Sequence, residues 1–269
     1  MRYWSHAFQI PVHWHDEVEI IYVRKGPLMV EIDGQKFIGD DGAVYIVSPG
    51  VLHMMAAPET PVDYFTFLFP MEFISFQKDE LEDEIFFPLR NHTREFRPEV
   101  TNRNLLEKLI PILDELSEEN GKFGTHRQIQ VRIRLLQVVD LLVEYDQLEA
   151  KTGRASGGLE KEILIYIQDN YHEHISLAEL SEHFHLSEKY MSRFFSERFH
   201  MTLTQYVNYV RLKYARHLLE STDLSVTEIA MKSGYPNVSY FIRKFSAAVG
   251  EPPLRYRNGK AVKDQKNRI

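Results

Sequence analysis

The stretch ISLAELS at residues 175–181 has a counterpart, LSVTEIA, 49 residues further along the chain at 224–230. Both contain Ser-x-x-Glu, in which the serine hydroxyl accepts a hydrogen bond from the amide three residues on and the glutamate reaches back to the serine amide. This capping box predicts that a short helix begins after each serine. One such motif is common by chance, so its repetition carries the information.

The similarity between the two stretches extends beyond the helix starts. Residues 190–195 (YMSRFF) match 240–245 (YFIRKF) at an offset of 50, so the second turn contains one extra residue. Each unit is therefore predicted to be a short helix, a tight turn and a second helix, which is the layout of a helix-turn-helix. Residues 202–219 between the units predict one helix of about 25 Å, which could hold two recognition helices about one DNA turn, ~34 Å, apart.

The second helix of each unit carries a stripe with one arginine among short side chains. Such a stripe suits a helix in the major groove, because arginine donates two hydrogen bonds to a guanine edge and short neighbours permit close approach. The alternative is a solvated face with a chance arginine, and the matching position of both arginines argues against it. The predicted DNA contacts are Lys189, Ser192, Arg193, Ser196, Ser239, Ile242, Arg243 and, as a phosphate ligand or simply a solvated residue, Arg211.

The first half of the chain has a different pattern. Residues 8–70 contain short β-branched and aromatic runs separated by turn signals such as Asp33-Gly34, which predicts a small barrel or sandwich. Apolar residues at helical spacing then predict helices over 102–119 and 126–149. Their apolar faces could pack on the barrel or form a dimer interface, and the sequence favours neither.

Composition limits the class of protein. A length of 269 residues suggests two domains, and the absence of cysteine excludes disulfide frameworks and thiolate metal sites. No run approaches the ~20 apolar residues of a membrane span, and no signal peptide is found, so a cytoplasmic location is expected. The net charge of −7 divides into −10 for residues 1–158 (16 basic, 26 acidic) and +3 for residues 159–269 (16 basic, 13 acidic).

The second half resembles the DNA-binding domain of the AraC/XylS family of bacterial transcription regulators. The similarity covers residues 159–257 and is carried by 175–180, 190–195, 211–215, 223–230, 239–245 and 250–257. It implies two helix-turn-helix units that read adjacent major grooves, with Lys189, Ser192, Arg193, Ser239, Ile242 and Arg243 at base-facing positions. His200 stands where many relatives have glycine, and Pro252 where threonine is usual, which puts the local turn geometry in question.

The first half resembles the cupins. Residues 13–26 match the pattern His-x-His-x3-Glu-x6-Gly, although Ala7 replaces the leading glycine, and residues 42–53 resemble the second cupin motif without its asparagine. The resemblance implies convergence inside the barrel of a metal-binding set comprising His13, His15, Glu19 and His53. Three imidazoles and one carboxylate suit a first-row divalent metal, and if residues 13–19 form one strand, their even spacing puts the first three on one face. The alternative is that these residues, together with Tyr22, bind an organic ligand directly.

These resemblances imply an α+β protein with four parts: a cupin-like sensing barrel over 1–100, a helical segment over 101–150, a linker over 151–158 and an all-α DNA-binding domain over 159–269. The expected function is a ligand-responsive, non-enzymatic activator of a carbohydrate-utilisation operon. Its expected partners are double-stranded DNA, a small-molecule effector with sugars as the leading class, RNA polymerase and a second copy of the chain, with no membrane. No cofactor is required, and a divalent metal in the barrel is an option. Two alternatives are a metal-dependent cupin enzyme fused to a DNA-binding domain and a constitutive DNA-binding protein with an oligomerising barrel.

Overall fold

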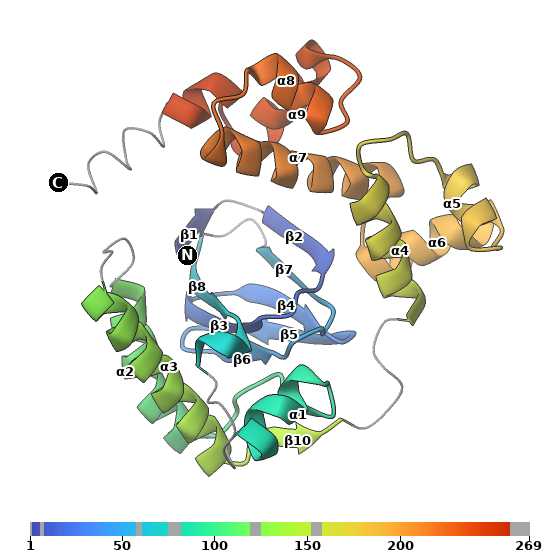
Figure 1. Cartoon of the computed structure of the whole chain (residues 1–269). Helices are drawn as coiled ribbons and strands as arrows, with labels where there is room; N and C mark the ends of the chain where they lie inside the picture. The colour runs from blue at the N-terminus through green and yellow to red at the C-terminus, as the bar shows by residue number, and fades with distance from the viewer. Residues whose placement is uncertain are drawn as a thin grey trace. The chain divides into compact units, whose positions relative to one another are not determined.

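The computed structural model describes residues 2–5, 8–57, 61–74, 82–118, 125–151 and 158–258, with side chains from residue 9 onward. The chain divides into two compact units, Met1–Gly157 and Gly158–Ile269, coloured blue to green and yellow to red in Figure 1. Most of the expected linker, residues 152–157, lies outside the described residues. No helix in the described part of the chain is long and apolar enough to cross a bilayer.

The first unit contains two four-stranded antiparallel sheets. One sheet has the order β1 (Arg2–Ser5), β8 (Val62–Phe69), β3 (Val18–Lys25) and β6 (Val44–Val47). The other has the order β2 (Phe8–His13), β7 (His53–Ala57), β4 (Leu28–Ile32) and β5 (Gln35–Gly39). Asp33 and Gly34 join β4 to β5 with positive φ angles of 50° and 77°, as a tight hairpin turn requires.

An apolar core lies between the two sheets. It combines Ile21 and Val23 of β3 with Val30 of β4, Tyr45 of β6 and Met55 of β7, all buried. Because successive side chains of a strand point to opposite faces, β3 also presents a second set of residues on the outer face of its sheet. That face carries the second apolar core of this unit.

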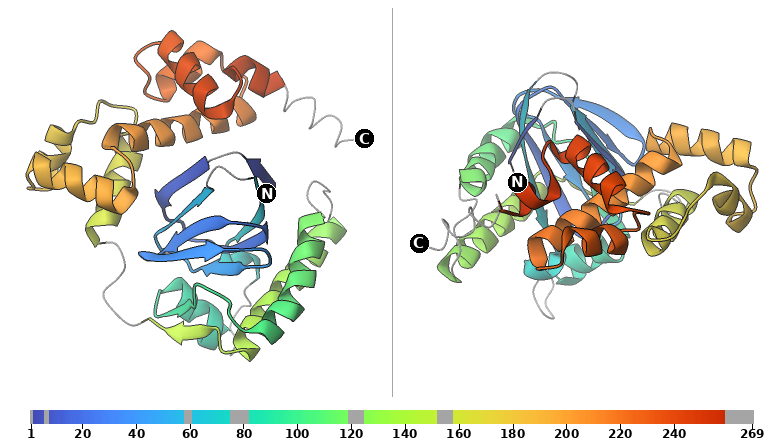
Figure 2. Two further views of the ribbon diagram at one scale, coloured as in Figure 1. Left: turned by 180° about the vertical axis from the view of Figure 1, so that it is seen from behind. Right: turned by 90° about the horizontal axis from the view of Figure 1, so that it is seen from above.

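Helices cover the outer face of the β3 sheet. The chain continues after β8 through the elements η1 (Met71–Phe73), η2 (Glu82–Phe86), α1 (Phe87–Arg90), β9 (Arg94–Phe96), α2 (Arg103–Glu118), α3 (Thr125–Glu144) and β10 (Leu148–Ala150). Helices α2 and α3 lie side by side (Figures 1 and 2), and their buried leucines join Ile20 and Phe65 of the sheet in one cluster. Packing on the barrel, one of the two expectations for these helices, is therefore observed.

The second of these helices is shorter than expected. Helix α3 ends at Glu144 rather than at residue 149, because Asp146 has a positive φ of 54° and the following residues leave the helix. Residues 148–150 form β10, which pairs antiparallel with β9. Helical spacing in the sequence could not reveal this ribbon, since its three-residue strands are stabilised by a partner about 50 residues away.

The second unit is entirely helical in its named elements. They are α4 (Gly158–Asn170), α5 (Leu177–His183), α6 (Glu188–Phe199), α7 (Leu203–Ser221), α8 (Val226–Lys232) and α9 (Val238–Val249). Figure 1 shows the long helix α7 with α5 and α6 at one end and α8 and α9 at the other. The pairs α5–α6 and α8–α9 are the two predicted helix-turn-helix units.

Both predicted capping boxes are present. Ser176 accepts a hydrogen bond from the Glu179 amide at 3.2 Å, and Glu179 accepts one from the Ser176 amide at 2.7 Å. Ser225 and Glu228 repeat the arrangement at 3.2 and 2.8 Å. A third box, which the sequence analysis missed, begins α7.

The two recognition helices end in the same backbone conformation. His200 after α6 and Gly250 after α9 both lie in the left-handed region, with φ of 55° and 86°. This conformation costs an L-residue roughly 1–2 kcal/mol, whereas glycine adopts it readily. We therefore predict that His200→Gly raises the free energy of unfolding by about 1 kcal/mol, measured by urea denaturation.

Gly250→Ala is the matched control for this prediction. It should lower the free energy of unfolding by about 1 kcal/mol, because it introduces a Cβ at the equivalent position. A neutral or destabilising His200→Gly would show that the contacts of the imidazole outweigh the backbone cost.

Candidate DNA-binding and ligand-binding sites

The recognition helices α6 and α9 are anchored in the same way. Ser187 caps α6 by accepting from the Tyr190 amide at 3.2 Å, and Asn237 caps α9 by accepting from the Tyr240 amide at 2.8 Å. On the buried side, Met191, Phe195 and Phe199 of α6 and Phe241 and Phe245 of α9 are almost completely inaccessible. This anchoring turns the opposite face of each helix toward solvent.

The predicted base-facing residues occupy these outward faces. All seven are exposed: Lys189, Ser192, Arg193, Ser196, Ser239, Ile242 and Arg243. Arg193 lies 3.7 Å from Glu197 in an exposed pair, and Arg243 lies over the Tyr240 ring at 5.2 Å from its centroid. Exposed pairs of this kind are weak, so both arginines can be released to another partner. Their contact with DNA stays a prediction.

Arg211 of α7 has a different role from the predicted phosphate contact. Its Nε donates to the Tyr171 carbonyl and a terminal guanidinium nitrogen donates to the Glu173 carbonyl, each at 2.7 Å. The side chain is half-buried, and burial lowers the pKa of its guanidinium. Because two of its donors bind backbone of the same unit, Arg211 has a structural role here, and its contact with a phosphate stays a prediction for the remaining donors.

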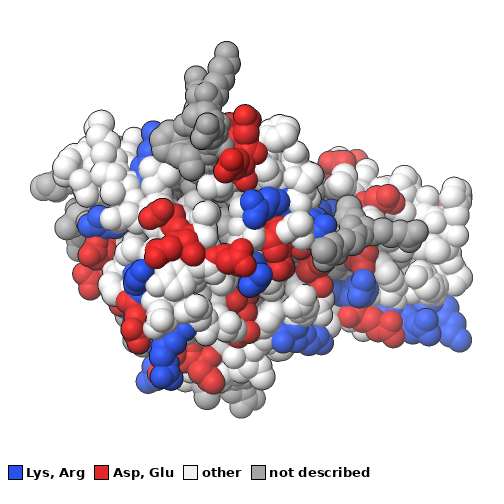
Figure 3. Space-filling model, turned by 90° about the horizontal axis from the view of Figure 1, so that it is seen from below, with Lys and Arg blue, Asp and Glu red and all other residues white. Residues whose placement is uncertain are grey.

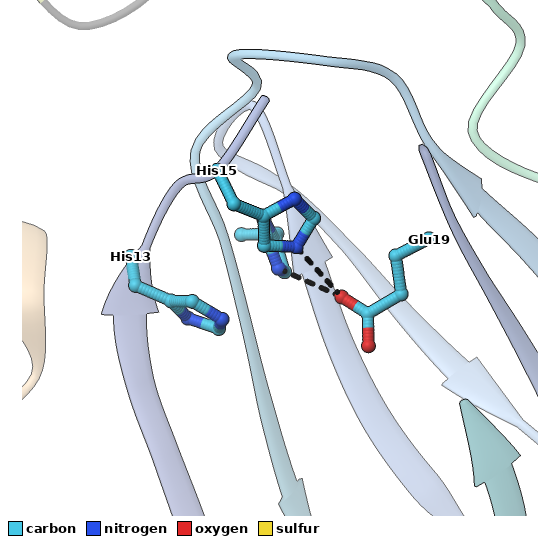
Figure 4. Close-up of side chains that lie close together, drawn as sticks. His13, His15 and Glu19 are labelled. Atoms are coloured by element: carbon cyan, nitrogen blue, oxygen red, sulfur yellow. Dashed lines mark hydrogen bonds and ion pairs between the residues drawn. The ribbon is translucent and has the colours of Figure 1, made fainter. Parts of the chain in front are cut away.

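Four side chains converge at one end of the barrel. The ligand atoms of His13, His15, Glu19 and His53 all lie within 4.8 Å of one another. The carboxylate oxygen Oε2 of Glu19 lies 3.2 Å from Nε2 of His15 and 3.0 Å from Nε2 of His53. Figure 4 shows the rings of His13 and His15 turned toward the Glu19 carboxylate. Glu19 and His53 are buried, and His13 and His15 are partly exposed, so the cluster lies at the margin of the core.

The orientation of each imidazole is set by the backbone. Nδ1 of His13 contacts the Pro11 carbonyl at 2.9 Å and Nδ1 of His53 contacts the Val51 carbonyl at 2.9 Å, each two residues earlier in the chain. Nδ1 of His15 contacts the Glu17 carbonyl at 3.0 Å. A carbonyl only accepts, so each Nδ1 carries the proton and each Nε2 is left to face the cluster. The sequence does not mark these carbonyls, because no side chain distinguishes them.

The electrostatics of the cluster separate its members. Burial, reinforced by the nearby His53, lowers the pKa of His13 to about 3, so this imidazole is neutral. Burial alone would raise the pKa of Glu19, but the interactions of its carboxylate with His15 and His53 outweigh this and lower it. A neutral imidazole and an ionised carboxylate are the forms in which these side chains bind metal ions.

The residues converge for a different reason from the one expected. His13 ends β2 and Glu19 lies in β3, so residues 13–19 do not form one strand. The chain passes from one sheet to the other between them, and the pairing of His13 with His53 across β2 and β7 brings in the third imidazole. The residues expected to converge do converge, but they do so from different strands and not from one face of a single strand.

Tyr22 does not belong to this cluster. It lies three residues after Glu19 in β3, and an odd spacing in a strand puts it on the opposite face. It is buried in the core against α2 and α3, close to Arg24, which binds Asp114 of α2 at 2.7 Å. Its assignment to the ligand set is therefore wrong, and it contributes to the packing of the helices on the sheet.

Comparisons with known proteins agree with this two-part arrangement. A family of AraC-like ligand binding domains matches residues 1–166, and a family of helix-turn-helix domains matches residues 180–259. The uncharacterized HTH-type transcriptional regulator YdeC of Bacillus subtilis (strain 168) is 26% identical over 255 residues, which cover 92% of this chain and 86% of that protein. The HTH-type transcriptional activator RhaS of Klebsiella pneumoniae (strain 342) is 24% identical over 259 residues, which cover 93% and 88%.

Among solved structures, the C-terminal domain of the response regulator AraT from Geobacillus stearothermophilus is similar to part of this chain. Its sequence identity is 29% and its TM-score 0.36, with 37% of this chain and 83% of that chain covered. The match to the ligand-binding family extends over the whole of the first unit and the start of the second, and the helix-turn-helix match covers the two recognition helices. The chain thus belongs to the AraC family and is a DNA-binding transcription regulator.

Proposed function

We propose that α6 and α9 read DNA bases through their exposed stripes. The observation that carries this assignment is the equivalence of Arg193 and Arg243, which lie at matching positions of two helices anchored by matching aromatic cores. Base-edge contacts specify a sequence, and arginine paired with guanine is the commonest of them. Two equivalent arginines on separate helices therefore predict a DNA site with two specific parts.

Replacing either arginine tests this assignment. Arg193→Ala and Arg243→Ala should each weaken binding to the selected DNA site by about 1–3 kcal/mol and relax the preference at one base pair. The site is first selected from random duplexes by the unmodified full chain, and binding is then measured by fluorescence anisotropy. Lys232→Ala, an exposed charge in α8 outside the stripes, is the control and should leave the base preference unchanged. Unaltered preferences in both arginine variants would contradict the assignment.

We propose that the barrel binds a small neutral effector, with sugars as the leading class, and that the bound chain activates transcription together with RNA polymerase. The family resemblance supports this, as does the presence of an activator, RhaS, among the relatives. The first 158 residues carry 16 basic and 26 acidic side chains, which disfavours a polyanionic effector. On the face shown in Figure 3, acidic and basic side chains lie interspersed and form no broad cationic surface.

The His/Glu cluster suits a divalent metal as part of the effector site. A carboxylate oxygen of Glu19 lies 3.2 Å from Nε2 of His15 and 3.0 Å from Nε2 of His53. In both imidazoles the proton on Nδ1 is already directed at a backbone carbonyl. A nitrogen lone pair and an anionic oxygen repel at this distance, so either a proton on Nε2, as in the hydrogen bonds that lower the pKa of Glu19, or a cation must lie between them. Ligands about 2.1 Å from a central ion are separated by roughly 3.0–3.4 Å, which matches these distances.

A metal held by these four residues would supply open coordination positions for hydroxyl oxygens of an effector. We propose that the centre binds its ligand and does not transform it, because the relatives are transcription regulators. The carbonyl contacts to Nδ1 would hold the imidazoles in position before the ion enters.

Metal and sugar binding can be measured on the full chain. We predict that Zn²⁺ or Mn²⁺ binds with 1:1 stoichiometry, measured by calorimetry. At a free metal concentration of 100 times the dissociation constant, binding should add about 2.7 kcal/mol to the free energy of unfolding. A sugar panel repeated with the metal present should contain a member that stabilises further. His53→Gln should weaken metal binding at least tenfold, whereas His217→Gln, which removes an exposed imidazole from α7, should not. Equal binding by both variants would contradict the site.

We also propose that the chain forms a homodimer through α3. Beyond the residues that pack on the barrel, α3 exposes 52% of Ile129, 41% of Ile133 and 38% of Val143. With the partly buried Leu136 they lie four, three and seven residues apart, which fits the heptad spacing of coiled coils except that Asp140 occupies the intervening position. A second copy of this helix is the occupant that its charge distribution favours.

The charges on α3 are divided between its two halves. Residues 125–134 contain three arginines and no acidic residue, whereas residues 135–144 contain an aspartate and a glutamate and no basic residue. Antiparallel pairing of two copies would place the basic half of each helix opposite the acidic half of the other. Such an interface is self-complementary, as two-fold symmetry requires.

A charge inserted into this stripe should separate the dimer. We predict that Ile133→Glu converts the full chain to a monomer at micromolar concentration, measured by sedimentation velocity. Ile38→Glu, at a position 72% exposed in β5, is the control and should remain dimeric. A monomeric unmodified chain, or a dimeric Ile133→Glu variant, would contradict the proposed interface.

A further inference from the structure

The turn of the second helix-turn-helix pair, α8–α9, touches the connection between α4 and α5, which leads into the first pair, through backbone. Gly234 follows α8 with a φ of 77°. A Cβ built on it would lie 2.7 Å from the Cα atom of His172 and 2.8 Å from the Tyr171 carbonyl oxygen, in the connection between α4 and α5. Contacts this short are not made by real Cβ atoms, so only glycine allows the two segments to approach so closely. Residues more than 60 positions apart in the sequence are thereby held together.

Arg211 reinforces the same contact from α7. Its two hydrogen bonds of 2.7 Å reach the carbonyls of Tyr171 and Glu173, which flank His172. The guanidinium carbon also lies 5.8 Å from the ring centroid of Tyr235, the residue after Gly234. One side chain thus contacts the α4–α5 connection, which precedes the first helix-turn-helix unit, and the turn of the second unit.

These residues form what we call the inter-unit clasp: Tyr171, His172, Glu173, Arg211, Gly234 and Tyr235. Tyr235 is buried, with only 4% of its surface exposed, and Tyr171 packs against Tyr214 of α7 at 5.3 Å between ring centroids. The clasp therefore lies in packed surroundings on both sides. Hydrogen bonds from a charged donor to backbone carbonyls contribute more than neutral ones, so the contact resists opening.

The connecting helix cannot fix the arrangement of the two units by itself. Helix α7 has 19 residues and sets an axial length of about 28 Å. Each recognition helix is held on α7 separately, α6 by Tyr206 against Phe195 and α9 by a core that Ala215 and Leu218 share with Phe241. The approach of Gly234 to His172 bypasses α7 and so restricts bending of this long helix between the two packing sites.

We infer that the inter-unit clasp locks the two helix-turn-helix units into one rigid body and so sets the spacing between the two parts of the DNA site. Arg211 and Gly234 are then positioning residues for specificity, although neither touches a base. This inference rests on the proposed base contacts of α6 and α9 for its effect on DNA. Its structural part, the fixed distance between the units, is independent of them.

Spacing is the property that a rigid arrangement controls. Each inserted base pair moves the second part of the site along the axis by about 3.4 Å and around it by about 35°. Rigidly joined recognition helices cannot follow this change, whereas loosely joined helices can. The clasp therefore predicts strong dependence on spacing at little cost in affinity for either part alone.

The distance between the units is tested first, on the full chain without DNA. Because the chain has no cysteine, Glu182→Cys in α5 and Ala247→Cys in α9 provide two unique positions for spin labels, both exposed. Pulsed electron–electron double resonance should give a single narrow distribution of distances between the two labels in the otherwise unmodified chain. Adding Arg211→Lys or Gly234→Ala should broaden or shift it, and adding Lys213→Met, an exposed charge loss in the same helix, should not. A broad distribution before any clasp substitution would overturn the inference, whatever the folding of the variants.

The dependence on DNA spacing is tested next. The selected site and versions with one or two inserted base pairs are compared by anisotropy, and the unmodified chain should lose at least about tenfold in affinity per insertion. Arg211→Lys should reduce this loss to threefold or less, because lysine keeps the charge but does not reproduce the planar two-donor contact. Lys213→Met should keep the full discrimination.

The same variants distinguish the clasp from a phosphate contact and from failure of the proposed base contacts. A phosphate ligand at position 211 would let lysine retain both affinity and spacing discrimination, which would overturn the clasp role. Unchanged discrimination in Arg211→Lys with a broadened distance distribution would likewise overturn it. Base preferences insensitive to Arg193→Ala and Arg243→Ala would overturn the proposed base contacts, while a narrow spin-label distance would still support the rigid arrangement.

Discussion

The burial of strand β3 on both faces is the constraint on which the first unit depends. Its alternate side chains point into the core between the sheets and into the core beneath α2 and α3, so one strand belongs to two apolar layers. Glu19 lies on the inner face and contacts His53 of the other sheet and His15 of the connection before β3, whereas Tyr22 lies on the outer face beside Arg24 and Asp114. A shift of one residue in the register of β3 would exchange these faces, removing the carboxylate from the cluster and exposing the packing surface of the helices.

The second unit presents two recognition helices, α6 and α9, that are anchored in the same way. Each recognition helix is capped at its start, buried along one side by aromatic residues and ended in the left-handed conformation. The same capping and packing interactions, made once in each helix-turn-helix unit, thus produce two equivalent exposed surfaces. Their relative placement is not local, however, and it depends on the approach of Gly234 to the backbone at His172 and on the two bonds of Arg211.

This division explains what the sequence could predict. The capping boxes and the helix-turn-helix pairs follow from short-range patterns, and the resemblance to the cupins implied the members of the His/Glu cluster; the structure contains all three features. The errors concern contacts between distant segments: the ribbon of β9 and β10, the passage of the chain between sheets at residues 14–17, and the two carbonyls that bind Arg211. The misplacement of Tyr22 is different, because its odd spacing from Glu19 was readable and the aromatic character of the residue outweighed it. A basic residue in a DNA-binding domain invites a phosphate assignment, and only the backbone around it shows that two of its donors already bind carbonyls.

A rigid DNA-reading unit restricts where an effector can act. Regulation requires that the effector bind the DNA-competent state with a different affinity from the other state. If the clasp prevents the two recognition helices from changing their separation, the two states cannot differ in the arrangement of these helices. The difference must lie in a relation between whole units or between copies of the chain, such as the pairing of α3. The proposed effector site then needs to alter only the barrel and its helices, and the second unit would respond as one body. The clasp that makes binding depend on the spacing of the DNA site thus also means that the DNA-binding unit moves without changing its internal arrangement when an effector binds.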